Sequence, residues 1–554
     1  MQLVKRGPEL ETLVSENFAF RPVSSVQLLK PFEKVPFVQQ NLLQINENYL
    51  VCSCGDENTV NVVEMSKFRE QIAKLDGQQD QEGEEQNTVE FDLTYPVNEV
   101  VVYIGISNGY IIVVTEQSTL FLVSLENALD SASWNSGKLK FSGPETFTGI
   151  TMCSIFNTSE IMVLYENNEL YQLSLENGSL SSTLFGKNIT YVDTFLNETL
   201  AYATTEAFCV AGKLFKLDFT DDDDEEDSKE LCPISITFIS KTKVLCCIGE
   251  NVAADTEDVF YNYKTYVVDL NNASFSETYD VTPAFATLLR KPCCYNLHLV
   301  NYIKDVSFVS VLASSSSSEL SVVSINEKKG GAVCVEQSVQ ESDRAILPMD
   351  ENTDEDTTPV GIALDCWNKE INLEKQLGEH AGEVDQKEYP LVYVLNNQGK
   401  MQIFAFLYAN FTDININKAI ECIPQSSLRG SSSDNSKDLP TTKQEGFQKP
   451  FSDEGKLKQA TSGKSIFGQT ASEKSSFGTP SFGSSGFGTS GFAQSNSKPN
   501  SETSTFEQQV SGGSIFGKPA FDQSGFGKLA TEESVSGQSG FGQSGFGQSG
   551  FGQS

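Results

Sequence analysis

Histidine, tryptophan and basic side chains are scarce in this sequence of 554 residues. It has two His and two Trp, and its 39 Lys and Arg stand against 75 Asp and Glu, which gives a formal net charge of −36 at pH 7. Proteins that grip nucleic acid need clustered Lys and Arg to neutralise phosphates. The composition therefore argues against nucleic acid as a direct partner.

Long apolar runs are also missing. No 18 consecutive apolar residues occur, and the opening residues MQLVKRGPELETLV contain no apolar signal-peptide core. A bilayer-spanning helix and a secretory signal each require such a run. The sequence thus predicts a soluble protein that is neither inserted in a membrane nor secreted.

The twelve Cys are expected to be reduced and buried. Adjacent pairs such as Cys246–Cys247 lie among aliphatic residues, and no CxxC spacing occurs. Only His298 and His380 could complete a zinc site, so these cysteines are interpreted as small hydrophobic residues. No metal and no cofactor is predicted.

Strand-period hairpins fill the chain between Tyr49 and Ala409. Each consists of an apolar strand, a polar turn and a second alternating strand, as in SEIMVLYENNELYQLSL, where Glu166–Glu169 form the turn. Seven such units begin near Leu50, Ile111, Ile161, Leu200, Val244, Val309 and Val392. Their steps suit blades of about 40 to 50 residues with inserted loops, so a seven-bladed β-propeller is predicted. Because Trp-Asp repeat marks are missing, a pair of β-sandwiches remains the alternative.

The composition changes near residue 461. From there to Ser554 the chain has nine Phe-Gly pairs, no Cys, no Trp and no Tyr. Gly, Ser and Gln dominate, and such a segment cannot offset the entropy of ordering, so we expect a disordered tail. Each Phe is then an isolated apolar group that makes one weak contact, and many such contacts together give multivalent binding to a partner. These residues are Phe467, Phe477, Phe482, Phe487, Phe516, Phe526, Phe541, Phe546 and Phe551.

These patterns divide the chain into three parts. We predict an all-β propeller domain over residues 1–420, a disordered linker over 421–460 and a disordered Phe-Gly region over 461–554. No P-loop, HExxH or nucleophile elbow occurs, so no catalytic residue can be named and no enzyme is predicted. A propeller-type hydrolase with polar residues in its central channel is the enzymatic alternative. A granule-forming scaffold with a prion-like tail is the alternative in another class.

Two acidic stretches interrupt the strand pattern. Asp221–Asp227 reads DDDDEED, and Asp350–Pro359 reads DENTDEDTTP. Blocks of like charge are usually solvated loops, and we interpret the first in that way. The other interpretation is a docking site for a basic partner.

The stretches SFSETYDVTPAF, SVLASSSSSEL, SDRAILPMDENTDEDTTPVGIALD and PLVYVLNNQGKMQIF resemble the fungal cytoplasmic-face FG nucleoporins. The resemblance is clearest from Ser274 to Phe404, and the tail agrees in kind. It implies a propeller at the cytoplasmic face of the nuclear pore complex, in the nuclear envelope, which recruits the DEAD-box helicase of mRNA export. It also implies FG repeats that bind transport receptors, and contacts with other nucleoporins.

By the same resemblance, the helicase-binding loop follows an Arg-Ala-x-Leu-Pro segment and precedes a Pro-x-Gly. The resemblance assigns helicase binding to Arg344, Asp354 and Asp356, with Asp350 and Glu355 as acidic neighbours that strengthen the local field. Family members continue into further repeats and an anchoring coiled coil, whereas this sequence stops within a repeat. The chain is therefore expected either to be a fragment or to lack that route of anchoring.

Overall fold

The computed structural model describes thirteen ranges and one single residue of the chain. These are residues 1–33, 41–54, 58–76, 89–146, 148–157, 159–176, 179–219, 231–250, 263–278, 281, 290–326, 330–368, 389–409 and 413–421. The acidic stretch Asp221–Asp227, the expected linker and the Phe-Gly region lie outside the described residues, apart from position 421.

In the part of the chain that the structure describes, thirty strands make up nearly all of the regular structure, and backbone hydrogen bonds group them into six sheets. Four sheets have four strands each: β4 (Leu43–Ile45), β5 (Tyr49–Cys52), β6 (Thr59–Glu64) and β7 (Leu93–Pro96); β8 (Val101–Ser107), β9 (Tyr110–Thr115), β10 (Thr119–Ser124) and β11 (Lys138–Lys140); β12 (Ile150–Asn157), β13 (Glu160–Tyr165), β14 (Leu170–Glu176) and β15 (Ser179–Gly186); β28 (Pro359–Asp365), β29 (Leu391–Asn396), β30 (Lys400–Tyr408) and β3 (Phe18–Gln27).

The other two sheets are larger. One has five strands, β24 (Cys294–Ile303), β25 (Val306–Ser314), β26 (Ser321–Asn326), β27 (Ala332–Ser338) and β2 (Thr12–Ser15). The last has nine, in the order β16 (Ile189–Phe195), β17 (Thr199–Thr204), β18 (Phe208–Val210), β19 (Lys213–Asp218), β1 (Gln2–Arg6), β23 (Ser274–Thr278), β22 (Tyr263–Asp269), β21 (Lys243–Glu250) and β20 (Leu231–Ser240).

Helices are few and short across the described ranges. The α-helices there are α1 (Met65–Asp76), α2 (Ser131–Ser136) and α4 (Ile416–Glu421), and two 3-10 turns are η2 (Leu125–Asn127) and η5 (Glu341–Asp343). Asp130 caps α2, because its carboxylate accepts the backbone N–H groups of Ala132 and Ser133. Within the described residues, no helix has the length and apolar character needed to cross a membrane.

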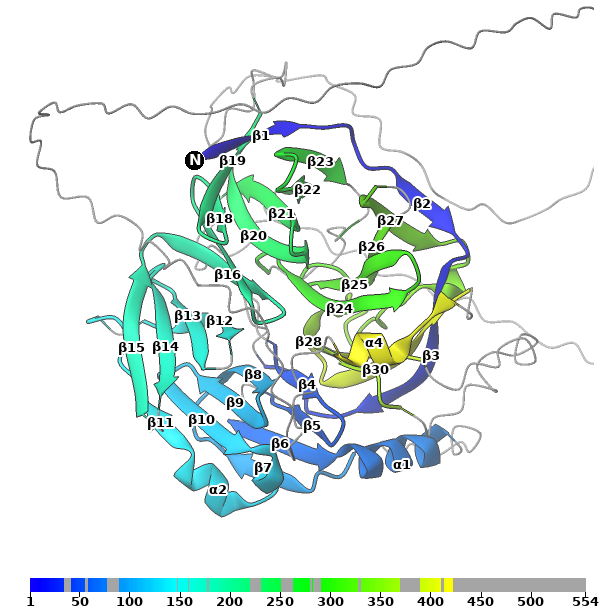
Figure 1. Cartoon of the computed structure of the whole chain (residues 1–554). Coiled ribbons are helices and arrows are strands. Elements are labelled where there is room, and N and C mark those ends of the chain that lie inside the picture. The colour runs from blue at the N-terminus through cyan, green and yellow to red at the C-terminus, as the bar shows by residue number, and fades with distance from the viewer. Residues whose placement is uncertain are drawn as a thin grey trace, which may run out of the picture. The chain divides into compact units, whose positions relative to one another are not determined.

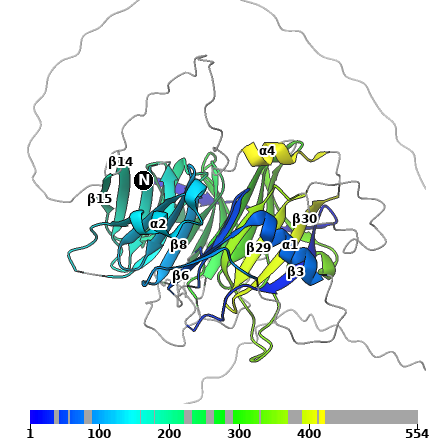
Figure 2. The same cartoon turned by 90° about the horizontal axis from the view of Figure 1, so that it is seen from below.

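The sheets are arranged around an axis as a propeller (Figure 1). The strands β4, β8, β12, β16, β20, β24 and β28 contact one another in that order, and β28 contacts β4 again. Apolar clusters fill the spaces between neighbouring sheets; one of them packs Val102 and Leu120 against Ile155 and Val163. Figure 2 shows α4 at one end of the ring, with β14 and β15 on the side away from β29 and β30. The predicted all-β propeller is thus confirmed.

The predicted hairpins are all present as antiparallel neighbours. In the clearest one, β13 ends at Tyr165 and β14 begins at Leu170, so the turn falls on Glu166–Glu169 as expected. Asn168 takes a φ of +62° in this turn, a conformation that Asn tolerates better than most residues. The turn residue and the apolar alternation together fix which side chains face the core.

The sheets do not form seven separate blades, which was the expectation. Five sheets of four or five strands each form a blade, and the sixth has nine strands. The nine-stranded sheet arises because β1 pairs in parallel with β19 at Val4–Leu217 and with β23 at Arg6–Phe275. A strand from the N-terminus therefore joins two antiparallel groups edge to edge.

The first 27 residues also complete the ring elsewhere. β2 adds in parallel to β27, and β3 adds antiparallel to β30, the last strand of the described ranges. The rings of Phe18 and Phe406 stack with centroids 5.4 Å apart, and both side chains are buried. Pairing the two ends of the domain removes the free edges that would otherwise let it open.

The cysteine prediction holds for the described residues. Eleven Cys are described, all of them free thiols, and nine are buried in the apolar interior. Burial raises the pKa of the Cys293 thiol to about 11, so the thiol stays protonated at neutral pH. Such residues pack as small hydrophobic side chains.

Candidate functional site

The acidic residues singled out by the sequence lie between β27 and β28. The connection begins with η5, continues through Ala345–Met349 and ends in a turn over residues 350–356. It crosses from the five-stranded sheet to the blade that β3 completes. Its position between two blades places the turn at a blade junction.

Two buried residues anchor this connection. Ala345 and Leu347 pack in one cluster with Ile362 and Leu364 of β28. Their backbone bonds reach the preceding hairpin, since Leu347 N–H donates to Ser318 O at 2.7 Å and Ala345 O accepts from Leu320 N–H at 3.0 Å. Ile346 and Met349, on either side of Leu347, are exposed. The base of the loop is therefore rigid, and its outer face carries apolar side chains.

Asp350 organises the turn from within. Its Oδ1 accepts the backbone N–H of Asn352 at 2.9 Å, and its Oδ2 accepts the Gln398 amide at 2.7 Å. Its own N–H donates to Glu355 O at 2.8 Å, and its carbonyl accepts Asp354 N–H at 2.9 Å. Both oxygens of this carboxylate are thus used inside the protein, so Asp350 positions its neighbours.

Asp354 and Glu355 form the exposed tip of the turn. Asp354 has a φ of +55°, in the left-handed region that Asn, Asp and Gly adopt most readily. Both side chains are exposed, whereas Asp356 is half-buried. Thr357, which follows, donates its hydroxyl to Pro348 O at 2.7 Å and closes the loop. Asp354 and Glu355 therefore present their carboxylates to solvent on a fixed backbone.

Arg344 lies at the base of the loop, apart from these carboxylates. Its Nε donates to Ser338 O at 3.2 Å and lies 4.0 Å from Glu319 Oε1, and 27% of its side chain is exposed. Among the described residues, no hydrogen bond or ion pair joins it to Asp350, Asp354 or the residues that follow. The structure thus brings Asp350, Asp354 and Glu355 together and holds Arg344 separately.

Sequence reasoning missed several residues of this site. Glu351, whose side chain is 80% exposed, pairs with Lys400 Nζ at 2.6 Å, and Gln398 holds Asp350. Gln398 and Lys400 belong to the β29–β30 hairpin, about fifty residues away in sequence. Nothing in the local pattern marks them, because only the sheet arrangement brings that hairpin under the acidic turn.

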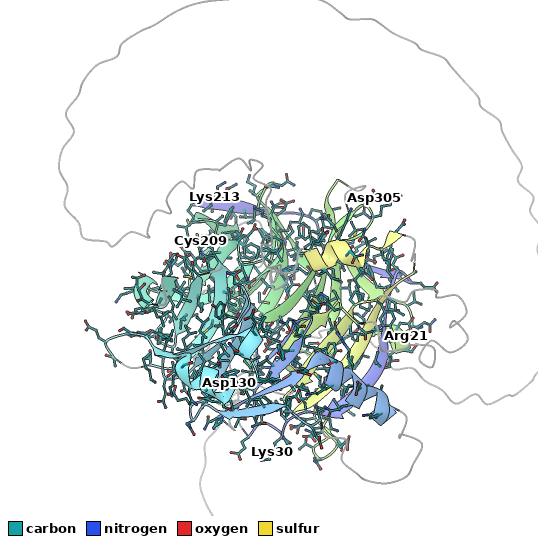
Figure 3. The ribbon with its side chains drawn as sticks, turned by 60° about the horizontal axis from the view of Figure 1, so that its bottom comes forward. Arg21, Lys30, Asp130, Cys209, Lys213 and Asp305 are labelled. Carbon is teal, nitrogen blue, oxygen red and sulfur yellow. The ribbon has the colours of Figure 1, made fainter. Side chains whose placement is uncertain are left out.

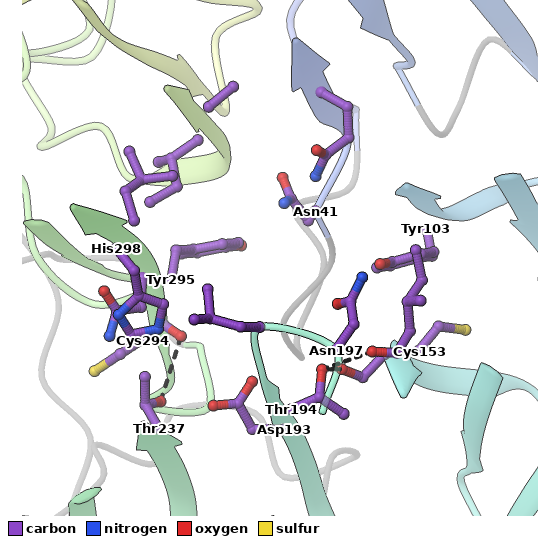
Figure 4. A pocket seen from close by; sticks show the side chains of 18 of the residues that line it. Asn41, Tyr103, Cys153, Asp193, Thr194, Asn197, Thr237, Cys294, Tyr295 and His298 are labelled. Carbon is purple, nitrogen blue, oxygen red and sulfur yellow. Dashed lines mark hydrogen bonds between the residues drawn. The ribbon is translucent and has the colours of Figure 1, made fainter. Parts of the chain in front are cut away.

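A second polar site is the central channel, a cavity of about 260 Å³. It is lined by residues of β4, β8, β12, β16, β20, β24 and β28, among them Tyr103, Asp193 and His298. Figure 4 shows the side chains of Asn41, Asp193, Thr194 and His298 around this space. The channel therefore receives one strand from each group around the ring.

Burial sets the charges in the channel. It raises the pKa of Asp193 to about 7, although the Phe238 N–H donates to its Oδ2 at 3.0 Å and opposes the rise. Burial also lowers the pKa of His298 to about 4, so this ring is neutral at physiological pH. His298 Nδ1 lies 3.3 Å from Ser310 Oγ. In the described residues, no group of His, Cys, Asp and Glu forms a metal site.

The fold and the family that matches it define the class of this protein. The closed ring of antiparallel sheets is a β-propeller, and the family described as the NUP159/214 beta propeller matches residues 36–401. This chain belongs to that family, whose members are nucleoporins by name.

Individual proteins of this family are similar to the chain in sequence and in structure. The chain is 28% identical over 412 residues to nucleoporin NUP159 of Saccharomyces cerevisiae, which covers 72% of this chain and 26% of the relative. It thus spans about a quarter of that relative's length. The solved N-terminal domain of Nup159 has a TM-score of 0.57 and 26% identity, over 73% of this chain and all of that one. A chain of the S. cerevisiae complex of dbp5 with nup159, gle1, IP6 and ADP has a TM-score of 0.59 and 26% identity, over 74% of this chain and all of that one.

Proposed function

We propose that this chain is a component of the nuclear pore complex at its cytoplasmic face, where the propeller docks the DEAD-box helicase of mRNA export. The observation that carries the proposal is the acidic turn, with Asp354 and Glu355 exposed on a base fixed by Asp350 and Leu347. The likeness to a nup159 propeller solved in complex with dbp5 supports the helicase as the partner.

The remaining site residues have distinct roles in this proposal. Arg344 keeps Nε on Ser338 O and uses its terminal N–H groups, which have no partner among the described residues, to bind a carboxylate of the helicase. Asp350 holds the turn, and Asp356 adds negative charge behind the tip. An acidic loop on an acidic domain speeds association with a basic surface more than it deepens final affinity.

The test neutralises the tip without disturbing its backbone. Asp354→Asn suits the positive φ, so Asp354→Asn with Glu355→Gln removes two charges and leaves the turn intact. We expect helicase affinity to fall by about tenfold at 0.05 M salt, or ~1.4 kcal/mol. The loss should shrink at 0.5 M salt, since the Debye length falls from about 14 Å to about 4 Å.

A matched control separates the site from overall charge. Glu198→Gln with Glu206→Gln removes two charges from exposed positions on another blade. This variant should bind the helicase like the unmodified protein at both salt concentrations. Equal losses in the two variants would mean that net charge alone governs binding, and the assignment of the loop would be wrong.

We propose further that the Phe-Gly region binds nuclear transport receptors, with its nine Phe as exchangeable weak contacts. These residues lie outside the described part of the chain, so the support is the repeated pattern and the family. Changing all nine to Ser should abolish receptor binding and leave the thermal unfolding of the propeller unchanged. A tail that condenses without binding receptors would favour the granule-forming scaffold instead.

We also propose that the ring counts seven blades and acts without catalysis. Dividing the nine-stranded sheet at β1 gives two antiparallel groups of four strands, and seven inner strands line the channel. We propose that the propeller domain spans residues 1–420, a linker spans residues 421–460 and the Phe-Gly region spans residues 461–554. Turnover in an activity screen that is lost with Asp193→Asn would revive the hydrolase alternative.

A further inference from the structure

The outer edges of the blades differ in how they are protected. An exposed strand edge invites pairing with another chain, and proteins guard it by short length, Lys, Pro or a covering strand. Here β7 has four residues and ends at Pro96, and β11 has three residues, of which Lys138 and Lys140 are charged. β3 carries Arg21 and Pro22, and Figure 3 shows Arg21 at the outside of the ring.

The N-terminal strands cover the next edges. β1 lies between β19 and β23, and β2 covers β27 with only four residues of its own. These additions are parallel, in register at Val4–Leu217 and Leu13–Glu336. The rim of this propeller thus already accepts an extended segment as an added strand in two of its sheets.

β15 has none of these protections. It ends its sheet at the rim, as Figure 1 shows, and runs for eight residues without Lys, Arg, Asp, Glu or Pro. Within the described part of the chain, its sole strand partner is β14. A register shift near Phe185 affects its last residues only. Ser179 to Leu184 therefore offers a regular, uncharged edge.

The two faces of β15 differ in polarity. Leu180 and Leu184 lie opposite Leu175 and Tyr171 of β14, and Leu180 packs against the apolar cluster between the second and third four-stranded sheets. Leu184 is 41% exposed, so an added apolar side chain would find a neighbour there. Ser181 and Thr183 on the other face are exposed and polar. A strand that alternates apolar and polar residues matches this edge.

The acidic residues around this edge favour an added strand that has basic residues at its ends. Between Ile150 and Lys187 the sequence has four Glu, at positions 160, 166, 169 and 176, and a single Lys. That Lys, Lys187, is already paired with Glu169 at 2.6 Å. Two copies of so acidic a domain repel each other, which disfavours self-pairing, whereas Lys or Arg at the ends of a strand is attracted.

We propose that the free edge of β15 is a docking site for an extended segment of another protein, added as a fifth strand. The segment alternates apolar and polar residues and carries basic residues at its ends. Backbone hydrogen bonds to residues 179–184 supply the pairing, Leu180 and Leu184 contact its apolar side chains, and the surrounding Glu residues attract its ends.

The probe is the labelled peptide KKTVTVTVKK, titrated against the whole chain by fluorescence anisotropy. Ser181→Lys with Thr183→Lys gives β15 the guard that β11 has, and should weaken binding roughly tenfold through like-charge repulsion across the strands. Ser181→Glu with Thr183→Glu should bind the peptide at least as well as the unmodified edge. Asn127→Lys with Thr205→Lys, at exposed positions elsewhere, is the matched charge control and should change little.

A second probe separates strand pairing from simple attraction to an acidic domain. Methylating the six Thr and Val amides of the peptide removes their N–H donors and keeps every charge, so binding should be lost. Retained binding of the methylated peptide would overturn the proposal, and so would equal weakening by the β15 and control Lys pairs. Absence of peptide binding together with a dimer broken by the β15 Lys pair would instead assign the edge to a second copy.

Discussion

A buried ion pair joins the first and last blades of the ring, and its removal gives a sharp test of how the ring is closed. Arg69 of α1 donates to Asp365 of β28 at 2.8 and 3.0 Å, and their side chains are 6% and 0% exposed. Asp365 also accepts the Trp367 N–H at 2.9 Å, and the Tyr393 hydroxyl lies 3.4 Å away. Arg69→Met keeps most of the apolar volume of the side chain and leaves the carboxylate without its counter-charge.

The expected cost follows from the burial of both partners. Breaking one side of a buried pair costs about 3–5 kcal/mol, because an uncompensated charge remains. A domain of roughly 400 residues has an unfolding entropy of about 0.8 kcal/mol/K, so Tm should fall by about 4–6 °C. Arg69→Met with Asp365→Asn removes both charges, and Asn can still accept the Trp367 N–H. We expect this double variant to recover most of the loss.

The pH dependence identifies the cause. Burial raises the pKa of Asp365 and Arg69 opposes that rise, so without Arg69 the folded pKa moves further above the unfolded one. The folded state then holds a proton that the unfolded state has released, and stability falls as pH rises between the two values. The deficit of Arg69→Met should be small near pH 4 and should grow as the pH rises above the unfolded pKa of Asp365, measured by thermal unfolding. A pH-independent deficit, or a double variant no better than the single one, would refute the charge argument.

Two further predictions concern the channel and the N-terminus. Asp193 has a folded pKa of about 7 against an ordinary value of 3.8, so its contribution to stability is lost as pH rises from about 4 to about 7. The free energy of unfolding of Asp193→Asn should therefore exceed that of the unmodified protein at pH 8 but not at pH 4. Urea unfolding at the two pH values measures this difference. Deleting residues 1–15 removes β1, β2 and the buried side chain of Val4 while β3 stays, so Tm should fall by only about 2–4 °C in calorimetry.

The sequence located the hairpins well for a simple reason. Each predicted first strand lies in the second strand of its group, from Leu50 in β5 to Val392 in β29. These strands are buried on both faces between neighbouring blades, so they form continuous apolar runs, and a clear turn follows each of them. The outer strands, such as β15 with its Ser and Thr residues, carry a weaker pattern, and the parallel additions of β1 and β2 leave no local signal at all.

The candidate loop was predicted less completely. Resemblance located Arg344 and the acidic residues, but a sequence cannot show that Asp350 uses both carboxylate oxygens inside the turn or that Arg344 is held by Ser338. The same limit applies to the channel, where Asp193 and His298 are 105 residues apart in sequence. Closure of the ring brings them to one cavity, and that closure is a property of the whole fold.

The position of the acidic turn links docking to the closure of the ring. Gln398, which holds Asp350, belongs to the same hairpin turn as Gly399, and Gly399 O accepts the N–H groups of Leu28 and Leu29 at 3.0 Å. Gln27 also donates to Gln398 O at 2.8 Å. The residues that close the last blade therefore support the turn that presents Asp354.

It follows that the N-terminal segment has two separable effects. Deleting residues 1–15 leaves the bonds that Gln27, Leu28 and Leu29 make to Gln398 and Gly399, so stability should fall while helicase affinity at 20 °C stays unchanged. Gln27→Ala removes a side chain that contacts the turn from below, so affinity should fall about two- to threefold with a small change in Tm. Titration of the helicase against both variants tests this division. If the deletion weakened helicase binding and Gln27→Ala left it unchanged, docking would depend on the outer strands and not on the closing hairpin.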